Sequence, residues 1–107
     1  MSEPVRIEVL GFAGCPNTAP TLELVHWVVA TTPVEAVVEQ IEVETQERVE
    51  ILRFLGSPTV RVNGHDVEPG ADARRDYVFS CRIYRDQAGV SGQPDERWLR
   101  AALGGDD

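Results

Sequence analysis

The stretch VRIEVLGFAGCPNTAP, residues 5–20, joins an alternating apolar segment to a cysteine and then to a segment that can begin a helix. Apolar residues occupy every second position from Val5 to Val9, which is the period of a half-buried β-strand. Asn17 or Thr18 can cap the element that follows, because their side chains accept hydrogen bonds from unpaired amides. The cysteine of this stretch therefore lies between a strand and the N-terminus of a helix.

The signals after this stretch predict alternating helices and strands. Thr45 can cap a second helix that Gly56 ends, and Asn63-Gly64 is a strong two-residue hairpin signal. We expect strands over residues 5–12, 34–43, 59–62, 65–67 and 80–85, and helices over residues 18–31, 45–55 and 94–103. A strand-helix-strand unit at the start implies a parallel pair of strands with a right-handed crossover.

Several apolar side chains of the predicted elements are expected in the core. The first helix has so few polar positions that we expect it to be largely covered, and Trp27 and Trp98 lie on helices that must cover the sheet. The segment SCRIYR puts Cys81 and Ile83 on one face, so we expect the Cys81 thiol to be shielded by its strand. The segments at residues 69–77 and 86–93 are expected to be loops.

Composition bounds the class of protein. With 107 residues, of which 42% are hydrophobic and 26% charged, we expect residues 1–107 to form a single domain. The net charge of -8 argues against nucleic acid and membrane surfaces as partners, because phosphates require clustered cations. All ten basic residues are arginines, which excludes lysine chemistry. With neither a signal peptide nor an apolar stretch of membrane-spanning length, we expect a cytoplasmic protein with reduced cysteines.

Two segments of the chain, together with the closing helix, resemble the thioredoxin-like superfamily. These segments are GFAGCPNT, residues 11–18, and GSPTVRVNG, residues 56–64. The Cys-Pro-x-Thr form is similar to a monothiol glutaredoxin site, since Thr18 stands where a two-cysteine site has its second thiol. The tail SCRIYR, GVSGQP and LRAAL resembles small bacterial proteins grouped with alkylmercury-lyase-related thioredoxin-like families. We carry no organomercurial activity over from that second resemblance.

The resemblance implies an α/β fold, a thioredoxin-like mixed central sheet with helices on both faces. It implies that Cys15 is the nucleophile, with Pro16 and Asn17 beside it in the substrate-binding turn. It also implies that Pro58 is cis and close to Cys15, with the backbone of Ser57 offered to an extended thiol substrate.

The chemistry of Cys15 can be weighed from its position. An unperturbed thiol has a pKa near 8.5, so only about 3% is thiolate at pH 7. A helix N-terminus favours the thiolate, and Asn17, Thr18 and backbone amides could donate hydrogen bonds to it. The alternative is that Cys15 is a small residue that only packs. For Cys81, core packing stands against a role as resolving or metal-sharing partner of Cys15, which would require Cα atoms within about 7 Å.

Other polar residues offer weaker signals. His26 and His65 have no ligand spacing to the cysteines, so we expect no metal site. Arg74 and Arg75 could bind an anionic co-substrate such as glutathione, although an exposed arginine pair is usually only solvated.

These observations lead to two hypotheses. In the first, Cys15 performs thiol-disulfide exchange on a thiol or disulfide substrate, either a protein or a small molecule, without a bound cofactor. Because Thr18 cannot form a disulfide, release of the mixed disulfide requires an external thiol or Cys81. In the second, the chain is a non-enzymatic binding module whose thiol packs or holds a soft metal, and whose partners dock at an acidic face.

Overall fold

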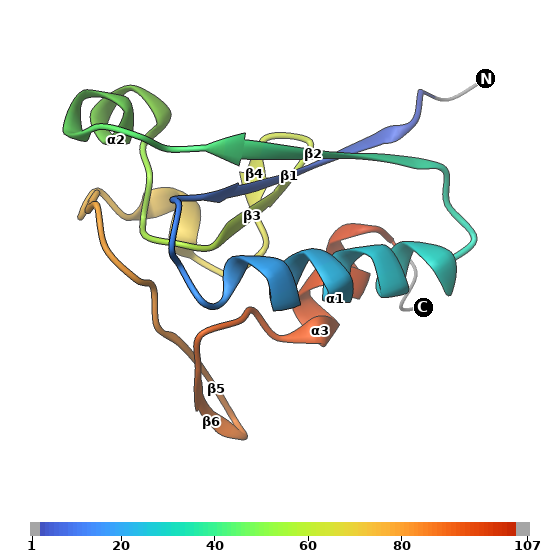
Figure 1. Ribbon diagram of the computed structural model, residues 1–107. Helices are drawn as coiled ribbons and strands as arrows, with labels where there is room; N and C mark the ends of the chain where they lie inside the picture. Colours follow the sequence, from blue (N-terminus) through green and yellow to red (C-terminus); the bar gives the residue numbers. More distant parts are fainter. Residues whose placement is uncertain (1–2, 105–107) are drawn as a thin grey trace.

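The computed structural model describes residues 3–104 and is built around the first predicted strand, β1 (Val5–Gly11). This strand pairs in parallel with β2 (Ala36–Glu42) and antiparallel with β3 (Thr59–Val62). The short β4 (His65–Asp66) pairs with β3 and completes the strand order β2-β1-β3-β4 (Figure 1). The predicted parallel pair and the predicted antiparallel return are both confirmed.

Helices lie on both sides of this mixed sheet, but one face is covered far more fully than the other. The helices α1 (Thr18–Ala30) and α3 (Glu96–Ala102) lie together on one side, and α2 (Gln46–Leu52) lies on the other (Figure 1). Successive side chains of a strand point to opposite faces, and Val9 and Leu10 accordingly belong to two separate apolar clusters. The chain therefore forms a mixed α/β domain, as predicted.

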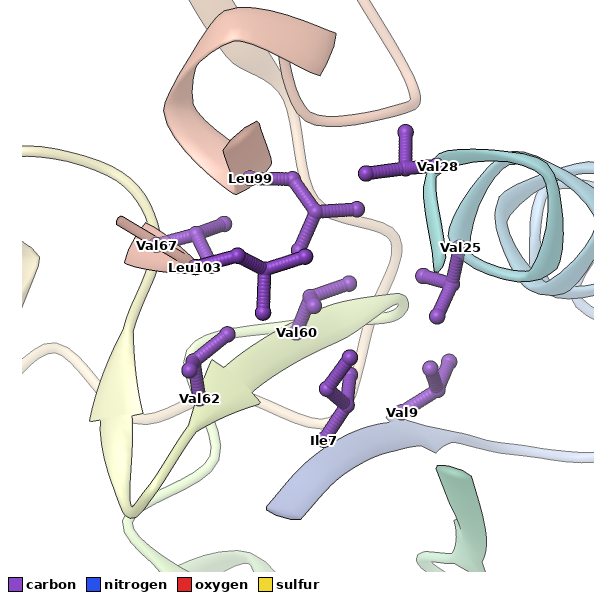
Figure 2. Close-up of a cluster of buried hydrophobic side chains, with 9 residues drawn as sticks. All are labelled: Ile7, Val9, Val25, Val28, Val60, Val62, Val67, Leu99 and Leu103. Atoms are coloured by element: carbon purple, nitrogen blue, oxygen red, sulfur yellow. The ribbon is translucent and has the colours of Figure 1, made fainter. Parts of the chain in front are cut away.

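The larger apolar cluster holds α1 and α3 against the sheet (Figure 2). Its members come from β1, β3, α1, α3 and the segment after β4, and each is nearly or fully buried. They are Ile7, Val9, Val25, Val28, Val60, Val62, Val67, Leu99 and Leu103. Full burial of one such side chain contributes about 1.5–3 kcal/mol, so this cluster fixes the helix that follows the cysteine loop.

The hairpin between β3 and β4 forms at the predicted turn. Asn63 and Gly64 both have positive φ, 51° and 87°, as the turn that matches strand twist requires. The Asn63 side chain also accepts a hydrogen bond from the Arg6 backbone N–H at 3.0 Å, which ties the turn to β1.

The expectation that α1 is covered on most sides is wrong. Its buried residues form a narrow stripe at three- and four-residue spacing, running from Thr18 and Thr21 to Val25 and Val28. Trp27 lies off this stripe and is 53% exposed, with the Arg100 guanidinium 5.0 Å from its ring centroid. Core packing was therefore the wrong expectation for Trp27, whereas Trp98 is partly buried against the larger cluster.

The second helix is shorter than predicted. Thr45 caps it as expected, because its hydroxyl accepts a hydrogen bond from the Arg48 N–H at 3.1 Å. The helix ends at Leu52, however, and not at Gly56, since Arg53 adopts a left-handed conformation with φ 54°. The residues that follow leave the helix and bury Phe54 in the smaller cluster.

The segment from residue 84 to residue 91 is a hairpin. The strands β5 (Tyr84–Asp86) and β6 (Gly89–Ser91) form a separate two-stranded sheet, where the sequence predicted only a connector after residue 85. The Asp86 carboxylate stabilises the turn by accepting hydrogen bonds from the N–H groups of Ala88 and Gly89, at 2.8 and 3.1 Å. The predicted loop at residues 69–77 contains one short 3-10 helix, η1 (Ala71–Ala73).

The last predicted helix begins slightly later than expected. Asp95 is its N-cap and accepts a hydrogen bond from the Arg97 N–H at 2.7 Å, so α3 starts at Glu96. Within residues 3–104, none of the helices combines the length and the apolar character needed to cross a membrane.

Candidate functional site

The loop between β1 and α1 holds Cys15 just outside the helix. The Cys15 N–H donates to the Phe12 carbonyl at 3.2 Å, and the Cys15 carbonyl accepts from the Thr18 N–H at 3.5 Å. Gly14 has φ 89° in this turn, a conformation that favours glycine. The thiol is half-buried, so it is held in place while remaining within reach of solvent.

Neither Asn17 nor Thr18 caps the helix through its side chain, although both residue types commonly do so. Asn17 is the N-cap of α1, yet its side chain makes no capping hydrogen bond, and Thr18 is the first helical residue. The Asn17 side chain instead packs against Gly92, where a Cβ atom would lie 2.3 Å from Asn17 Nδ2. Pro16 is exposed.

The loop before β3 meets Cys15 from the other side. The Ser57–Pro58 bond is cis, as expected, and Cys15 Sγ lies 3.7 Å from the Ser57 carbonyl oxygen, to which the thiol donates. Ser57 is fully buried, and its Oγ lies 3.3 Å from Thr18 Oγ1 and 3.4 Å from the Phe12 nitrogen. Cys15, Thr18, Ser57 and Pro58 are therefore brought together, although 39 residues separate Thr18 from Ser57.

Cys81 also lies at this site, and its side chain is exposed. The Ser57 N–H donates to the Ser80 carbonyl and the Arg82 N–H donates to the Ser57 carbonyl, both at 2.9 Å, which sets Cys81 opposite Ser57 in a parallel bridge. The Cys81 and Cys15 side chains lie close enough for each to shift the pKa of the other. The expectation that Cys81 is shielded in the core is wrong, since it is an exposed free cysteine.

The predicted faces of the SCRIYR segment are reversed. Arg82 and Tyr84 are buried, at 3% and 2% exposure, while Ile83 is 58% exposed. The burial of Tyr84 is accounted for by its hydroxyl, which donates to the Pro58 carbonyl at 2.5 Å.

The burial of Arg82 is accounted for by two carboxylates. The Arg82 guanidinium donates to both carboxylate oxygens of Asp66, at 2.8 and 3.1 Å, to Glu68 at 2.6 Å and to the Thr59 hydroxyl at 3.0 Å. It also lies 4.4 Å from the Tyr84 ring centroid. These contacts raise the pKa of Arg82 against the opposing effect of burial, so the cation is retained. Arg82 and Tyr84 therefore act as two buried polar anchors of the segment that carries Cys81.

The Cys15 thiol is more acidic than an ordinary thiol. Burial alone would raise its pKa, but four hydrogen-bond donors together lower the pKa below that of an ordinary thiol. In order of effect these are the Ser57 hydroxyl, the Thr18 hydroxyl, the Asn17 backbone N–H and the Cys81 thiol. A thiolate with a lowered pKa is the reactive form in exchange reactions.

The Cys81 thiol is shifted in the opposite direction. Its pKa is raised by partial desolvation, by the negative charge of the nearby Cys15 thiolate and by the hydrogen bond that Cys81 donates to it. The pKa values of the two thiols are therefore shifted apart, with Cys15 the more acidic of the pair.

The structure corrects one role implied for Ser57. Both its N–H and its carbonyl are already bonded to residues 80 and 82, so its backbone is not offered to an external extended chain.

The remaining polar candidates lie outside this site. Arg74 bonds Asp76 at 2.7 and 3.0 Å and lines a cleft of about 470 Å³ that includes His65 but neither cysteine. His26 and His65 are exposed. Among residues 3–104, no group of three or more potential metal ligands comes together.

Sequence reasoning missed the two anchors of the site, Arg82 and Tyr84. The available signal was charge: an arginine within an apolar segment can be buried only if acidic residues approach it. Asp66 and Glu68, just after the predicted hairpin turn, are such residues. They lie far from Arg82 in the sequence, however, so the sequence did not indicate that they pair with it.

Comparison with known proteins adds no assignment. The chain matches no family model, and neither a curated protein nor a solved structure is detectably similar to it.

Proposed function

We propose that this chain is a thioredoxin-like protein that performs thiol-disulfide exchange, with Cys15 as the attacking thiol and Cys81 as the resolving thiol. The observation that carries the proposal is that Cys15 and Cys81 both lie at Ser57, Cys15 through its thiol and Cys81 through a backbone bridge, and that their pKa values are shifted in opposite directions. The mixed sheet with helices on both faces, and Cys15 between β1 and α1 beside the Ser57–Pro58 loop, support the fold assignment.

The first step is attack by the Cys15 thiolate on one sulfur of a substrate disulfide. A bond forms between Cys15 Sγ and that sulfur, the substrate S–S bond breaks, and the second substrate sulfur leaves as a thiolate that takes a proton from solvent. The hydroxyls of Ser57 and Thr18 stabilise the attacking form without being consumed.

The second step frees the remaining half of the substrate. Formation of the mixed disulfide removes the negative charge from Cys15, and with it two of the causes that keep the Cys81 thiol protonated. Cys81 then loses its proton to solvent, and its thiolate attacks Cys15 Sγ. The Cys15–Cys81 bond forms, the bond between Cys15 and the substrate sulfur breaks, and the second substrate sulfur leaves as a thiolate that takes a proton from solvent. The net reaction oxidises two protein thiols and reduces one substrate disulfide to two thiols.

Turnover requires an external reductant of the thiol class. A dithiol, or two equivalents of a monothiol such as glutathione, would reduce the Cys15–Cys81 disulfide, as is possible in a reducing compartment such as the cytoplasm.

The proposal is tested by mass spectrometry of single-cysteine variants mixed with a small disulfide. We expect Cys81→Ser to accumulate an adduct of half the disulfide on Cys15, because nothing resolves it. We expect Cys15→Ser to form adducts far more slowly, and the wild type to pass through the adduct without accumulating it.

Equal and slow adduct formation by both variants would contradict the proposal. It would favour the binding module, in which the thiols pack or hold a soft metal.

A further inference from the structure

The backbone edge beside Cys15 is occupied by the chain itself. The Ser57 carbonyl lies 3.7 Å from Cys15 Sγ, and the Ser57 N–H and carbonyl are bonded to residues 80 and 82, respectively, at 2.9 Å. A polypeptide substrate that docked there as an added strand would have to displace this segment, because each of these groups already has its partner.

The occupying segment is firmly held. Arg82 and Tyr84 are buried on either side of Ile83, the first by Asp66 and Glu68 and the second by the Pro58 carbonyl. Displacement would expose these groups or leave them buried without partners. Extended polypeptide segments are therefore poor candidates for the substrate of Cys15.

A separate groove reaches Cys15 without involving Cys81. It has a volume of about 370 Å³ and runs between the β1–α1 loop, the first turns of α1 and the end of β2. This volume falls within the range of about 300–1,000 Å³ that is usual for small-molecule sites. Cys81 does not line the groove, so a ligand in it can reach Cys15 while Cys81 keeps its place.

The lining of the groove indicates the chemistry of the ligand. Phe12, Ala19 and Leu22 supply apolar walls, and the Phe12 ring is held by an edge-to-face contact with Phe79 at 5.4 Å between centroids. Glu42 is the one charged residue among those that line the groove, and it is acidic. The net charge of -8 acts in the same direction, since it repels anionic ligands.

We propose that the substrates of Cys15 are low-molecular-weight disulfides that are uncharged or cationic, bound in the groove between the β1–α1 loop and β2. This inference rests on the proposed thiol-disulfide exchange and assigns its substrate class. Anionic small disulfides and disulfides within polypeptides are disfavoured, the first by charge and the second by the occupied backbone of Ser57.

The test compares four disulfides with the fully reduced, full-length chain at neutral pH. The probes are cystamine, bis(2-hydroxyethyl) disulfide, oxidised glutathione and insulin. The second-order rate constant for loss of the Cys15 thiol is measured with each probe. It is divided by the rate constant for 2-mercaptoethanol with the same probe, which corrects for differences in the intrinsic reactivity of the four disulfides. We expect the first two normalised values to exceed those of oxidised glutathione and insulin by about tenfold, the ratio set by about 1.4 kcal/mol.

The variant Glu42→Gln tests the role of charge, and Glu39→Gln on the same strand is its matched control. Glu42 lines the groove and Glu39 does not, and both are exposed. We expect Glu42→Gln to reduce the ratio of cystamine to bis(2-hydroxyethyl) disulfide by about two- to fivefold, the range of an exposed ion pair. We expect Glu39→Gln to change this ratio less.

The outcomes separate the two proposals. If a Cys15–Cys81 disulfide forms but insulin or oxidised glutathione gives the highest normalised value, the substrate class is wrong and the exchange reaction stands. If no probe reacts faster with the protein than with 2-mercaptoethanol, and no Cys15–Cys81 disulfide forms, the exchange reaction itself is overturned. An unchanged ratio in Glu42→Gln would overturn the assignment of the groove.

Discussion

The substitution Arg82→Met should both destabilise the fold and uncouple the two thiols. The Arg82 side chain is 1% exposed and pairs with Asp66, whose side chain is 3% exposed. Methionine fills part of the volume but leaves that carboxylate buried without its cation. Removing one partner of a buried ion pair costs about 3–5 kcal/mol.

The expected loss in the free energy of unfolding determines whether the variant stays folded. A domain of this length is stable by about 5–15 kcal/mol, so Arg82→Met is expected to remain folded at low temperature with a strongly lowered urea midpoint. Asp66 still accepts a hydrogen bond from the Glu68 N–H at 2.9 Å, which places the expected loss at the lower end of the range. Arg82 Nε has no hydrogen-bond partner among residues 3–104, which already limits the net contribution of the wild-type pair.

The effect on the thiols follows from the position of Arg82. Its backbone N–H bonds the Ser57 carbonyl, next to Cys81, so loosening this segment lowers the effective concentration of Cys81 at Cys15. We expect the Cys15–Cys81 disulfide of the variant to be reduced by a weaker thiol buffer than the wild-type disulfide.

The assay combines urea unfolding with equilibration in thiol buffers, for Arg82→Met, Arg82→Lys and the control Arg48→Met. Lysine keeps the charge but not the planar fork, so we expect an intermediate loss. Arg48 is exposed, and its substitution should change stability by less than about 0.5 kcal/mol. The reasoning is refuted if Arg82→Met matches Arg48→Met in both stability and thiol equilibrium.

Three further outcomes are expected. Tyr84→Phe leaves the Pro58 carbonyl without its donor and should cost about 1–3 kcal/mol in urea unfolding, while a loss below that range would show that this hydrogen bond does not anchor the segment. Gly11→Ala places a Cβ atom 2.6 Å from Thr18 Oγ1 and 2.9 Å from Ser57 Oγ, so it should destabilise the chain by about 1–3 kcal/mol. Because it displaces these two hydroxyls, it should also slow alkylation of Cys15 at neutral pH, and alkylation at the wild-type rate would argue against their role. Cys81→Ala removes a donor that lowers the pKa of Cys15, so the pH midpoint of Cys15 alkylation by iodoacetamide should move upward, and an unchanged or lower midpoint would contradict the assigned proximity of the two thiols.

The sequence predicted those parts of the molecule whose signals are local. The alternation of β1, the cap at Thr45 and the Asn63-Gly64 turn each depend on neighbouring residues, and each is present. Cys15 could likewise be placed before a helix because the strand and the helix start are both visible in the chain. The cis bond before Pro58 was expected only from resemblance to a family.

The parts that sequence could not predict depend on distant partners. A two-residue period cannot tell which face of SCRIYR is buried, since Arg82 is buried by acidic residues 14 and 16 positions away. The contact between Cys15 and Cys81 likewise depends on the bridge of residue 81 to Ser57. Trp27 was misplaced because an apolar helix gives no indication of which stripe faces the sheet.

The most direct test of the proposed dithiol is the identity of the disulfide that forms in solution. The reduced wild-type chain is equilibrated in an oxidising thiol buffer, alkylated, and cleaved after arginine without reduction. Cys15 then lies in the peptide of residues 7–48 and Cys81 in the peptide of residues 76–82. We predict that these two peptides are recovered joined, with a mass two hydrogens below their sum, and that they separate on reduction. Recovery of both peptides individually alkylated, or of each carrying only a buffer thiol, would contradict the pairing of Cys15 with Cys81.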